Sequence, residues 1–287
     1  DQDGQTTLQW DQTTRCDTLC INDDEYCRYT NEFWTARQRQ ASKLHEISYR
    51  ACFKPQLPRF FISLLTDPGE IVYDPFTGRG TTPLEAALLG RQVISNDINP
   101  LSRILTEPRL FLPVYEEIKA RLYAIPDNPE GTSEIDLSMF YHPDTLRTLC
   151  SIRGYLLDRE KRGELDRTDA WIRMVATNRL SGHSPGFFSV YTLPPNQAVS
   201  PERHITITRD RNQIPPYRDV REIILKKSRS LLQGIDQKQR ENLIRAADSS
   251  LFITGDARRT PEIPDNTVSL TVTSPPFLDI VQYATDN

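Results

Sequence analysis

Five residues near the carboxyl end of the chain combine hydrogen-bond acceptors with an aromatic ring, in the run Thr273-Ser274-Pro275-Pro276-Phe277. The apolar run 267–272 before them predicts a buried strand. Because two successive prolines fit neither a helix nor a central strand, they predict a rigid, exposed corner at the carboxyl end of that strand. The corner would present the Ser274 hydroxyl and the Pro275 carbonyl as fixed acceptors beside the Phe277 ring, which suits an extruded base with an exocyclic amine. The alternative is an ordinary Pro-Pro turn.

A glycine-rich turn stands much earlier in the chain, in the run Asp74-Pro75-Phe76-Thr77-Gly78-Arg79-Gly80-Thr81-Thr82. It follows an apolar strand predicted over residues 71–73. The two glycines free the backbone of side chains where the strand turns into a helix, so a ligand can approach main-chain N–H groups at the positive end of that helix. One of the two threonines is expected to cap the helix, with Pro83 in its first turn.

A second strand, predicted over residues 92–95, brings an acid close to this turn. The helix between the strands is expected to end at Gly90, and the strand leads to Asp97 in a loop closed by Asn99-Pro100. A strand, a glycine turn, a helix and a second strand ending in an acid about 20 residues on form a layout that cradles a nucleoside, with the acid on the ribose hydroxyls. The spacing to Asp97 disfavours the alternative, a tight turn without a ligand.

Together these motifs resemble those of the amino-directed DNA methyltransferases, which use S-adenosylmethionine to methylate adenine-N6 or cytosine-N4. DPFTGRGTT resembles the family's cofactor motif, NDINP its ribose-binding loop and TSPPF its catalytic tetrad. The run 53–57 is similar to the amino-terminal cofactor-flanking motif, and Gly255-Asp256-Ala257 to the acid loop after the third strand. The resemblance covers residues 45–107 and 249–287.

The resemblance implies an α/β fold, a Rossmann-like S-adenosylmethionine-dependent methyltransferase sheet with a largely helical insert. We expect this chain to supply about four strands of the sheet, in the order 3-2-1-4 along the chain. Family members continue beyond the tetrad with further strands, whereas this chain stops at Asn287. We therefore expect an incomplete catalytic domain, which is inactive as a fragment.

The resemblance also implies direct methyl transfer without a nucleophilic cysteine. Ser274 and the Pro275 carbonyl would hold the amine while Phe277 stacks on the flipped ring. Asp97 would bind the ribose, Asp256 the adenine edge and Asp74 the methionine moiety. The implied catalytic residues are Ser274, Pro275, Pro276 and Phe277, and the implied cofactor-binding residues are Phe53, Asp74, Phe76, Gly78, Gly80, Thr81, Asp97 and Asp256.

Serine at the head of the tetrad is the version associated with cytosine-N4 in this family. The expected function is therefore a site-specific DNA methyltransferase that acts on a cytosine flipped out of duplex DNA. Four alternatives stay open: an adenine-N6 enzyme, an RNA base methyltransferase, a fragment that binds cofactor without turnover, and one that only contacts DNA. A cognate restriction endonuclease as a partner is also left open.

The stretch between Pro100 and Ser250 is far longer than a crossover needs, which indicates an inserted target-recognition region. We expect an amino-terminal extension over 1–44, cofactor-binding and catalytic parts over 45–108 and 249–287, and the insert over 109–248. Apolar spacing predicts helices over 115–123, 143–157, 166–180 and 217–232, the third of them with Trp171, Ile172, Met174 and Val175 on its buried face. Between them lie a glycine-rich aromatic run, 180–191, and an alternating run, 203–211.

Basic and aromatic residues of the insert are candidates for nucleic-acid contact, with arginine and lysine on phosphates and the polar loop near bases. The candidates are His183, Phe187, Arg218, Arg221 and Lys226. The alternative is a solvated basic helix face on a structural insert.

Charge and cysteine content restrict the remaining possibilities. A net charge of -4 and a pI near 5.7 argue against indiscriminate nucleic-acid binding but permit a local basic groove. Cys16, Cys20 and Cys27 could begin a zinc site, but their spacing matches no common pattern, so free thiols and no metal are expected. The chain has no apolar segment approaching 18 residues and no signal-like start. We expect a cytoplasmic protein that does not contact membranes.

Overall fold

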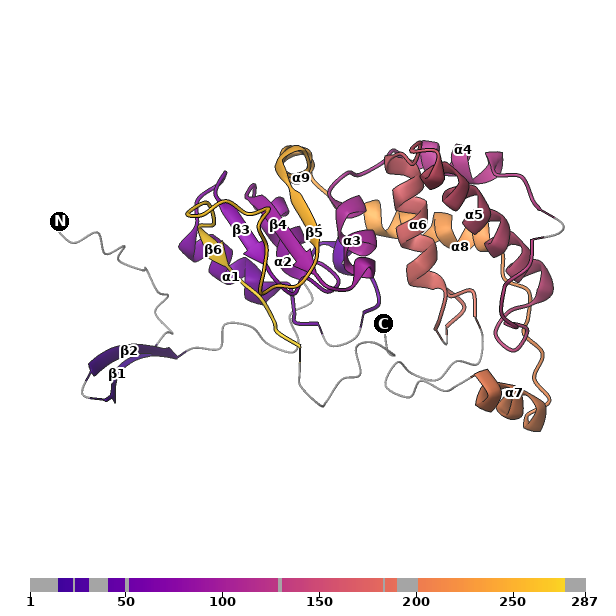
Figure 1. The fold of residues 1–287 in the computed structure, drawn as a ribbon, viewed down its shortest axis with the longest axis horizontal. Helices are drawn as coiled ribbons and strands as arrows, with labels where there is room; N and C mark the ends of the chain where they lie inside the picture. The colour runs from indigo at the N-terminus through magenta and orange to yellow at the C-terminus, as the bar shows by residue number, and fades with distance from the viewer. Residues whose placement is uncertain are drawn as a thin grey trace.

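A computed structural model describes residues 15–22, 24–30, 41–49, 52–128, 131–182, 184–189 and 201–276. Two of the candidate residues, His183 and Phe277, lie outside this part of the chain. The described residues form a sheet lobe, a helical lobe beside it and a separate two-stranded hairpin (Figure 1).

The helices and strands follow one another as β1 (Arg15–Ile21), β2 (Asp24–Thr30), η1 (Lys43–His45), α1 (Gln56–Leu65), β3 (Ile71–Asp74), α2 (Thr81–Leu88), β4 (Gln92–Asp97), α3 (Pro100–Thr106), η2 (Glu107–Arg109), α4 (Tyr115–Ala124), α5 (Pro143–Lys161), α6 (Arg167–Arg179), α7 (Pro201–Asp210), α8 (Val220–Leu232), α9 (Gln237–Ser249), β5 (Leu251–Thr254) and β6 (Leu270–Thr271).

Four parallel strands form the sheet, in the order β5-β4-β3-β6. Numbered along the chain this order is 3-2-1-4, which confirms the predicted α/β topology. β6 is shorter than its apolar run predicts, because only Leu270 and Thr271 pair with β3. In β4, Val93, Ile94, Ser95 and Asn96 are all buried, as expected of a central strand of a parallel sheet.

Helix α2 forms the centre of the sheet lobe. It packs on β3 and β4 and contacts α1 on one side and α9 on the other. All eight of its residues are buried, which follows from a sequence that is apolar or small nearly all round. The predicted insert boundary therefore needs a correction: α9 contacts α2 and β4, so it belongs to the sheet lobe although the sequence analysis places it within 109–248.

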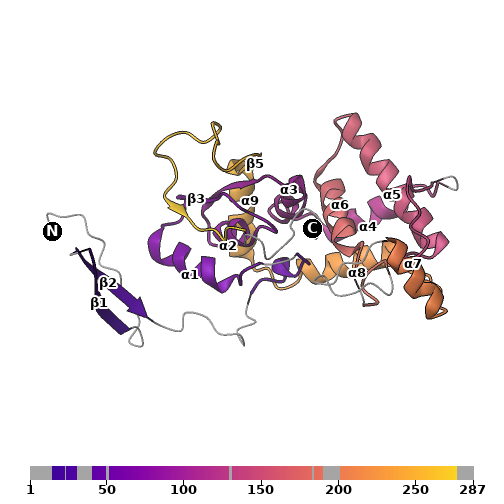
Figure 2. The ribbon, with the colours of Figure 1, turned by 60° about the horizontal axis from the view of Figure 1, so that its bottom comes forward.

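The helical lobe consists of α4, α5, α6, α7 and α8. Trp171, Ile172, Met174 and Val175 of α6 are buried, as the apolar spacing predicts. The Trp171 indole N–H donates to the Ser228 hydroxyl of α8 over 2.9 Å. The alternating run 203–211 lies mostly in the helix α7. In both views α3 lies between the sheet and this lobe, and it contacts α6 (Figures 1 and 2).

Strands β1 and β2 form an antiparallel hairpin that stands apart from the two lobes (Figure 2). Asp17 and Arg28 form an ion pair across it, with Nε–Oδ1 and Nη2–Oδ2 distances of 2.8 and 2.5 Å. The hairpin has no counterpart in the predicted elements. Within the described part of the chain, no helix has the length and apolar character needed to cross a membrane.

Candidate functional site

The candidate site lies where the carboxyl ends of β3, β4 and β6 meet. β3 ends at Asp74, β4 ends at Asp97, and β6 leads into the corner Ser274-Pro275-Pro276. Because β3 pairs with β4 on one side and with β6 on the other, the glycine turn after β3 stands between the acid and the corner. This edge is where ligands bind in open parallel sheets.

The glycine turn, residues 77–80, depends on its two glycines. Gly78 and Gly80 have positive φ angles of 52° and 80°. A Cβ on Gly80 would come within 2.4 Å of the Thr106 hydroxyl, and one on Gly78 within 3.2 Å of the Tyr49 ring. The prediction that Thr81 or Thr82 caps α2 is wrong, because the left-handed Gly80 is the N-cap and makes no side-chain bond. The first N–H groups of α2 have no partner within the helix and face the turn.

Asp97 ties this turn to β4. Its Oδ2 accepts the Gly78 N–H over 2.7 Å, and its Oδ1 accepts the Asn99 N–H over 2.9 Å. Asp97 is the last residue of β4 rather than part of the following loop. Each carboxylate oxygen has a second lone pair, so the half-buried group can still accept hydrogen bonds from a ligand.

Asn96 joins the loops on either side of β4, and the sequence analysis missed it. Its Nδ2 donates to the Pro75 carbonyl over 3.3 Å and to the Gly255 carbonyl over 3.1 Å. The side chain is fully buried, and its Oδ1 has no hydrogen-bond partner among the described residues. The available signal was an amide side chain inside an apolar strand, because a buried amide needs partners.

Asp74 is a buried carboxyl at the end of β3, with a relative exposure of 1%. Its Oδ1 accepts the Thr273 hydroxyl over 2.6 Å and the Phe76 N–H over 3.1 Å, whereas Oδ2 has no hydrogen-bond partner in the described structure. Burial raises the pKa of Asp74 to about 6 against the lowering effects of Thr273, Phe76 and the nearby Thr82 hydroxyl, while the charge of Asp97 raises it further. Asp74 thus titrates close to neutral pH.

The tetrad residues 274–276, called the corner here, follow β6 as a segment without regular secondary structure. Ser274 is half-buried, and Pro275 and Pro276 are exposed. Because proline has no N–H, this corner cannot continue the backbone ladder that holds β6 to β3. The corner is thus placed at the carboxyl end of a strand, next to the end of β3.

The remaining cofactor candidates differ in exposure. Phe76 is exposed, Phe53 is half-buried and Thr81 is buried. The Asp256 carboxylate accepts hydrogen bonds from the Arg258 guanidinium, the nearest at 2.5 Å, and from the Arg258 N–H. These bonds lower the pKa of Asp256 to about 2.

The candidate nucleic-acid-binding residues of the insert differ in their exposure and in the hydrogen bonds that they make within the protein. Arg221 donates to the Leu122 and Ile125 carbonyls over 3.1 and 3.0 Å and to Asp127 over 2.9 Å. Lys226 is exposed, and Arg218 is half-buried. Arg221 therefore completes the carboxyl end of α4, whereas Lys226 points to solvent.

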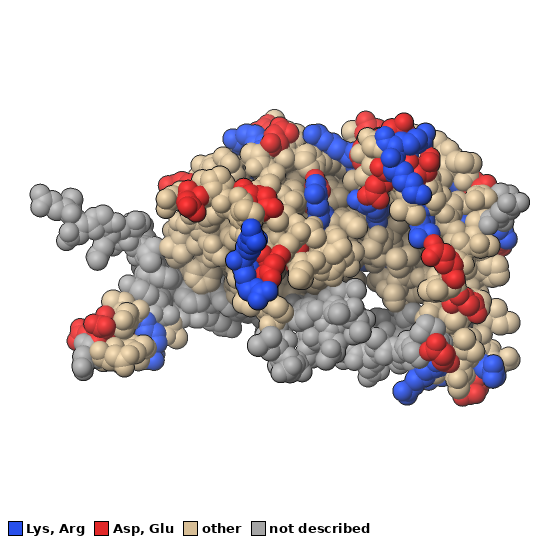
Figure 3. Space-filling view, viewed as in Figure 1, with Lys and Arg blue, Asp and Glu red and all other residues tan. Residues whose placement is uncertain are grey.

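Phe187 packs within the helical lobe. Its ring is half-buried, lies against Gly182 and carries the Arg179 guanidinium over its face at 4.1 Å from the ring centre. On the face drawn in Figure 3, basic and acidic side chains alternate over the helical lobe without a continuous basic patch.

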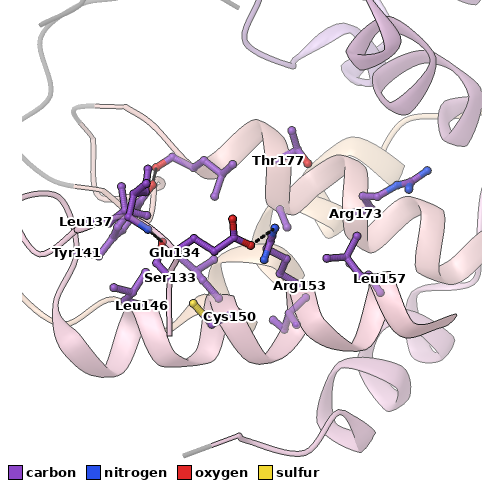
Figure 4. Close-up of a pocket in the computed structure, with 16 residues that line it drawn as sticks. Ser133, Glu134, Leu137, Tyr141, Leu146, Cys150, Arg153, Leu157, Arg173 and Thr177 are labelled. Atoms are coloured by element: carbon purple, nitrogen blue, oxygen red, sulfur yellow. Dashed lines mark hydrogen bonds and ion pairs between the residues drawn. The ribbon is translucent and has the colours of Figure 1, made fainter. Parts of the chain in front are cut away.

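Of two cavities in the described structure, one lies within the helical lobe and the other reaches the carboxyl end of β5. An apolar one of about 540 Å³ lies between α5, α6 and residues 133–141, with Cys150 in its wall and the Glu134–Arg153 ion pair, 3.7 Å, beside it (Figure 4). A polar one of about 640 Å³ separates α3 from α6 and reaches Thr254 at the end of β5.

Comparison with known proteins connects this geometry to a family. The DNA methylase family model for N6- and N4-directed enzymes matches residues 9–103, which contain the glycine turn and Asp97. Over this part the chain is similar to the amino-directed DNA methyltransferase family. Its parallel sheet with helices is the α/β, Rossmann-like fold of such a methyltransferase.

Two curated relatives support the assignment. The chain is 26% identical to the type II methyltransferase M.BsoBI of Geobacillus stearothermophilus over 264 residues, 83% of this chain and 50% of that protein. It is 36% identical to the type II methyltransferase M.MjaII of Methanocaldococcus jannaschii over 62 residues, 22% of this chain and 12% of that protein. The chain thus spans about half the length of M.BsoBI. No solved structure matches it.

The unpartnered polar atoms at the strand ends fit a nucleoside ligand that carries a positive group. Asp74 Oδ2 and Asn96 Oδ1 are buried acceptors without partners among the described residues. The Asp97 carboxylate retains free lone pairs beside the glycine turn. Acceptors of this kind suit hydroxyl, amine and ammonium donors.

Proposed function

We propose that this chain is part of an S-adenosylmethionine-dependent DNA methyltransferase, and that it methylates the N4 amine of a cytosine flipped out of duplex DNA. One observation carries the proposal: the turn held by Asp97 and the corner at Ser274 stand at the ends of two paired strands, joined by the 2.6 Å hydrogen bond from Thr273 to Asp74. A nucleoside site and an amine-binding corner at one sheet edge are what methyl transfer to a base amine requires.

The cofactor site is assigned from the strand ends outward. When bound, S-adenosylmethionine supplies an activated methyl group on its sulfonium. Asp97 accepts hydrogen bonds from the ribose hydroxyls, and Asp74 Oδ2 accepts one from the methionine ammonium. Gly78 and Gly80 let the cofactor approach the backbone, beside Thr81 at the start of α2. Asp256 takes the adenine edge, with Phe53 and Phe76 along the walls.

The corner is assigned to the base. The Ser274 hydroxyl oxygen and the Pro275 carbonyl accept the two N–H groups of the amine and turn its lone pair toward the methyl group. Pro276 keeps the corner rigid, and Phe277 stacks on the flipped ring. A serine at the head of the tetrad supports cytosine-N4 over adenine-N6.

The helical lobe is assigned to DNA. We propose that Lys226 and Arg218 contact phosphates and that His183 and Phe187 lie near bases, whereas Arg221 acts mainly within the protein. The relatives named as type II methyltransferases support a place in a restriction-modification system. We further propose a cognate endonuclease as partner and a location in the cytoplasm.

Mass analysis of nucleosides tests the proposal. Duplex DNA and RNA are incubated with the full-length protein and S-adenosylmethionine, then digested. We expect N4-methylcytosine from DNA alone. N6-methyladenine would show that adenine is the target base, and modified RNA would show that RNA is a substrate. Cofactor binding without any methylated nucleoside would indicate a binding protein without methyltransferase activity.

Calorimetric titration of the cofactor tests the site separately. Asp97→Ala removes a charge-assisted acceptor, so affinity should fall by about 1.5 to 3 kcal/mol for each ribose hydrogen bond lost. The matched control is Asp219→Ala, which removes an N-cap carboxylate of α8 that accepts the Glu222 N–H over 3.0 Å. The control should bind the cofactor like wild type. Equal affinity in all three proteins would contradict the assignment of Asp97.

A further inference from the structure

One side-chain hydrogen bond takes over where the backbone pairing of β3 with β6 ends. The last backbone bond of this pair runs from the Val272 N–H to the Tyr73 carbonyl over 3.1 Å. The next residue, Thr273, donates its hydroxyl to Asp74 Oδ1 over 2.6 Å. Pro275 and Pro276 have no N–H to extend the ladder. Among the described residues, the hydrogen bond of the Thr273 side chain is therefore the last one that joins β3 to this segment before the corner.

The acceptor of this bond is itself fixed. Asp74 is 1% exposed, and the Phe76 N–H donates to the same Oδ1 over 3.1 Å. Phe76 belongs to the loop that leads into the glycine turn, so one oxygen atom is bonded to both motifs. A shift of that oxygen relative to the turn would move the corner with it.

We propose that Asp74 and Thr273 are a positioning pair that sets the Ser274-Pro275-Pro276 corner relative to the glycine turn. This inference rests on the proposed function, in which the turn holds the methyl donor and the corner holds the amine. Neither side chain of the bond contacts the amine. The pair acts on the alignment of the two reactants, and a misplacement of about 1 Å is enough to lower a rate by about 100-fold.

Variants that differ in one hydroxyl test the pair in the full-length protein. Thr273→Val keeps the branched shape and removes the donor, and Thr273→Ser keeps the donor. We expect Thr273→Val to lower kcat by about 10- to 100-fold. The affinity for S-adenosylmethionine should fall less than kcat does, because the glycine turn and Asp97 remain in place. Thr273→Ser should recover most of kcat.

Two measurements without cofactor or DNA separate positioning from stability. In the apo protein, the Asp74 carboxyl carbon should titrate at higher pH in Thr273→Val than in wild type or Thr273→Ser, because the variant loses a hydrogen bond that favours the carboxylate. The charge of Asp97 faces Asp74 equally in all three proteins. The NMR order parameter of the Ser274 N–H should fall only in Thr273→Val.

The outcomes decide between the pair and its alternatives. Wild-type kcat in Thr273→Val, or equal losses in the valine and serine variants, would overturn the proposal. So would a kcat loss that follows a lower unfolding temperature, or an unchanged Ser274 order parameter. Thr273→Ala serves as the second hydroxyl-free variant if valine prevents folding. A wild-type protein that transfers no methyl group would refute the proposed function. The Asp74 titration and the Ser274 order parameter would still test whether Asp74 and Thr273 position the corner.

Discussion

Two carboxyl groups at neighbouring strand ends have opposite surroundings. Asp97 is half-buried and accepts two backbone N–H groups, which satisfy a carboxylate. Asp74 is buried, and burial outweighs its hydrogen bonds, so its pKa rises to about 6. Because the two charges repel, ionisation of Asp74 costs more while Asp97 is charged. A cationic ligand beside Asp74 would relieve both effects, which suits a site for an ammonium group.

The raised pKa of Asp74 predicts a pH-dependent stability. Because the pKa rises from 3.8 to about 6 on folding, the folded state holds this proton more tightly than the unfolded state does. The contribution of this proton to the free energy of unfolding is complete below pH 3.8 and is lost as the pH rises to about 6. It amounts to on the order of 3 kcal/mol. The side chain of Asp74→Asn does not titrate. As the pH rises from 3.8 to about 6, the unfolding free energy of the variant should therefore increase relative to that of wild type. Urea unfolding at several pH values measures the difference, and parallel curves would contradict the buried carboxyl.

Spacing alone identified only part of the site. Gly78, Gly80 and Asp97 could be predicted because local sequence determines a strand, a turn and the next strand. The bond between Asp74 and Thr273 could not, since it joins residues 199 positions apart and exists only once β6 pairs with β3. Asn96 was missed for the same reason, because its partners follow two other strands.

Elements with strong periodicity were predicted well. α4, α5, α6 and α8 lie where apolar spacing placed them, since each buries one clear stripe. α9 was assigned to the wrong part of the chain, because its sequence shows a buried face without showing that α2 and β4 cover it. The hairpin β1–β2 gave no signal, because it buries little apolar surface.

Helix α8 offers a test that separates structural from DNA-binding arginines and lysines. Arg221→Met should destabilise the fold by about 1 to 3 kcal/mol, because the Leu122 and Ile125 carbonyls lose their donor, and should leave the salt dependence of DNA binding nearly unchanged. Lys226→Met, the matched control on an exposed position of α8, should change stability by less than about 0.5 kcal/mol. If Lys226 contacts a phosphate, its loss reduces the salt slope by about one.

Urea unfolding and DNA titration at three salt concentrations measure both variants. A lower salt slope for Arg221→Met at wild-type stability would indicate that Arg221 contacts DNA. An unchanged slope for Lys226→Met would indicate that Lys226 is a solvated residue without a phosphate contact.

At the scale of the whole molecule, residues 41–49 connect the two lobes. On the sheet side, His45 bonds to Glu85 of α2 over 2.7 Å, and burial lowers the pKa of the imidazole against the opposing effect of Glu85. Arg79, within the glycine turn, donates to the His45 and Ile47 carbonyls over 3.3 and 3.2 Å. Residues 41–49 thus accept hydrogen bonds from the glycine turn, and the same segment also contacts the helical lobe.

On the helical side, Asn178 of α6 exchanges two hydrogen bonds with Ser48: its Nδ2 donates to the Ser48 carbonyl over 2.8 Å, and its Oδ1 accepts the Ser48 N–H over 3.2 Å. Asn178→Ala leaves both backbone groups without this partner, so residues 41–49 should exchange their amide hydrogens faster. The control is Asn242→Ala in α9, which removes a buried hydrogen bond to the Leu88 carbonyl, 3.0 Å, remote from the segment.

Both variants should lose about 1 to 3 kcal/mol of stability. Only Asn178→Ala should also speed exchange around Gly78, because Arg79 ties that turn to the same segment. Faster exchange in residues 41–49 with no change at the turn would mean that the helical lobe and the glycine turn are independent. The proposed DNA contact of one lobe could then not influence the other lobe through this segment.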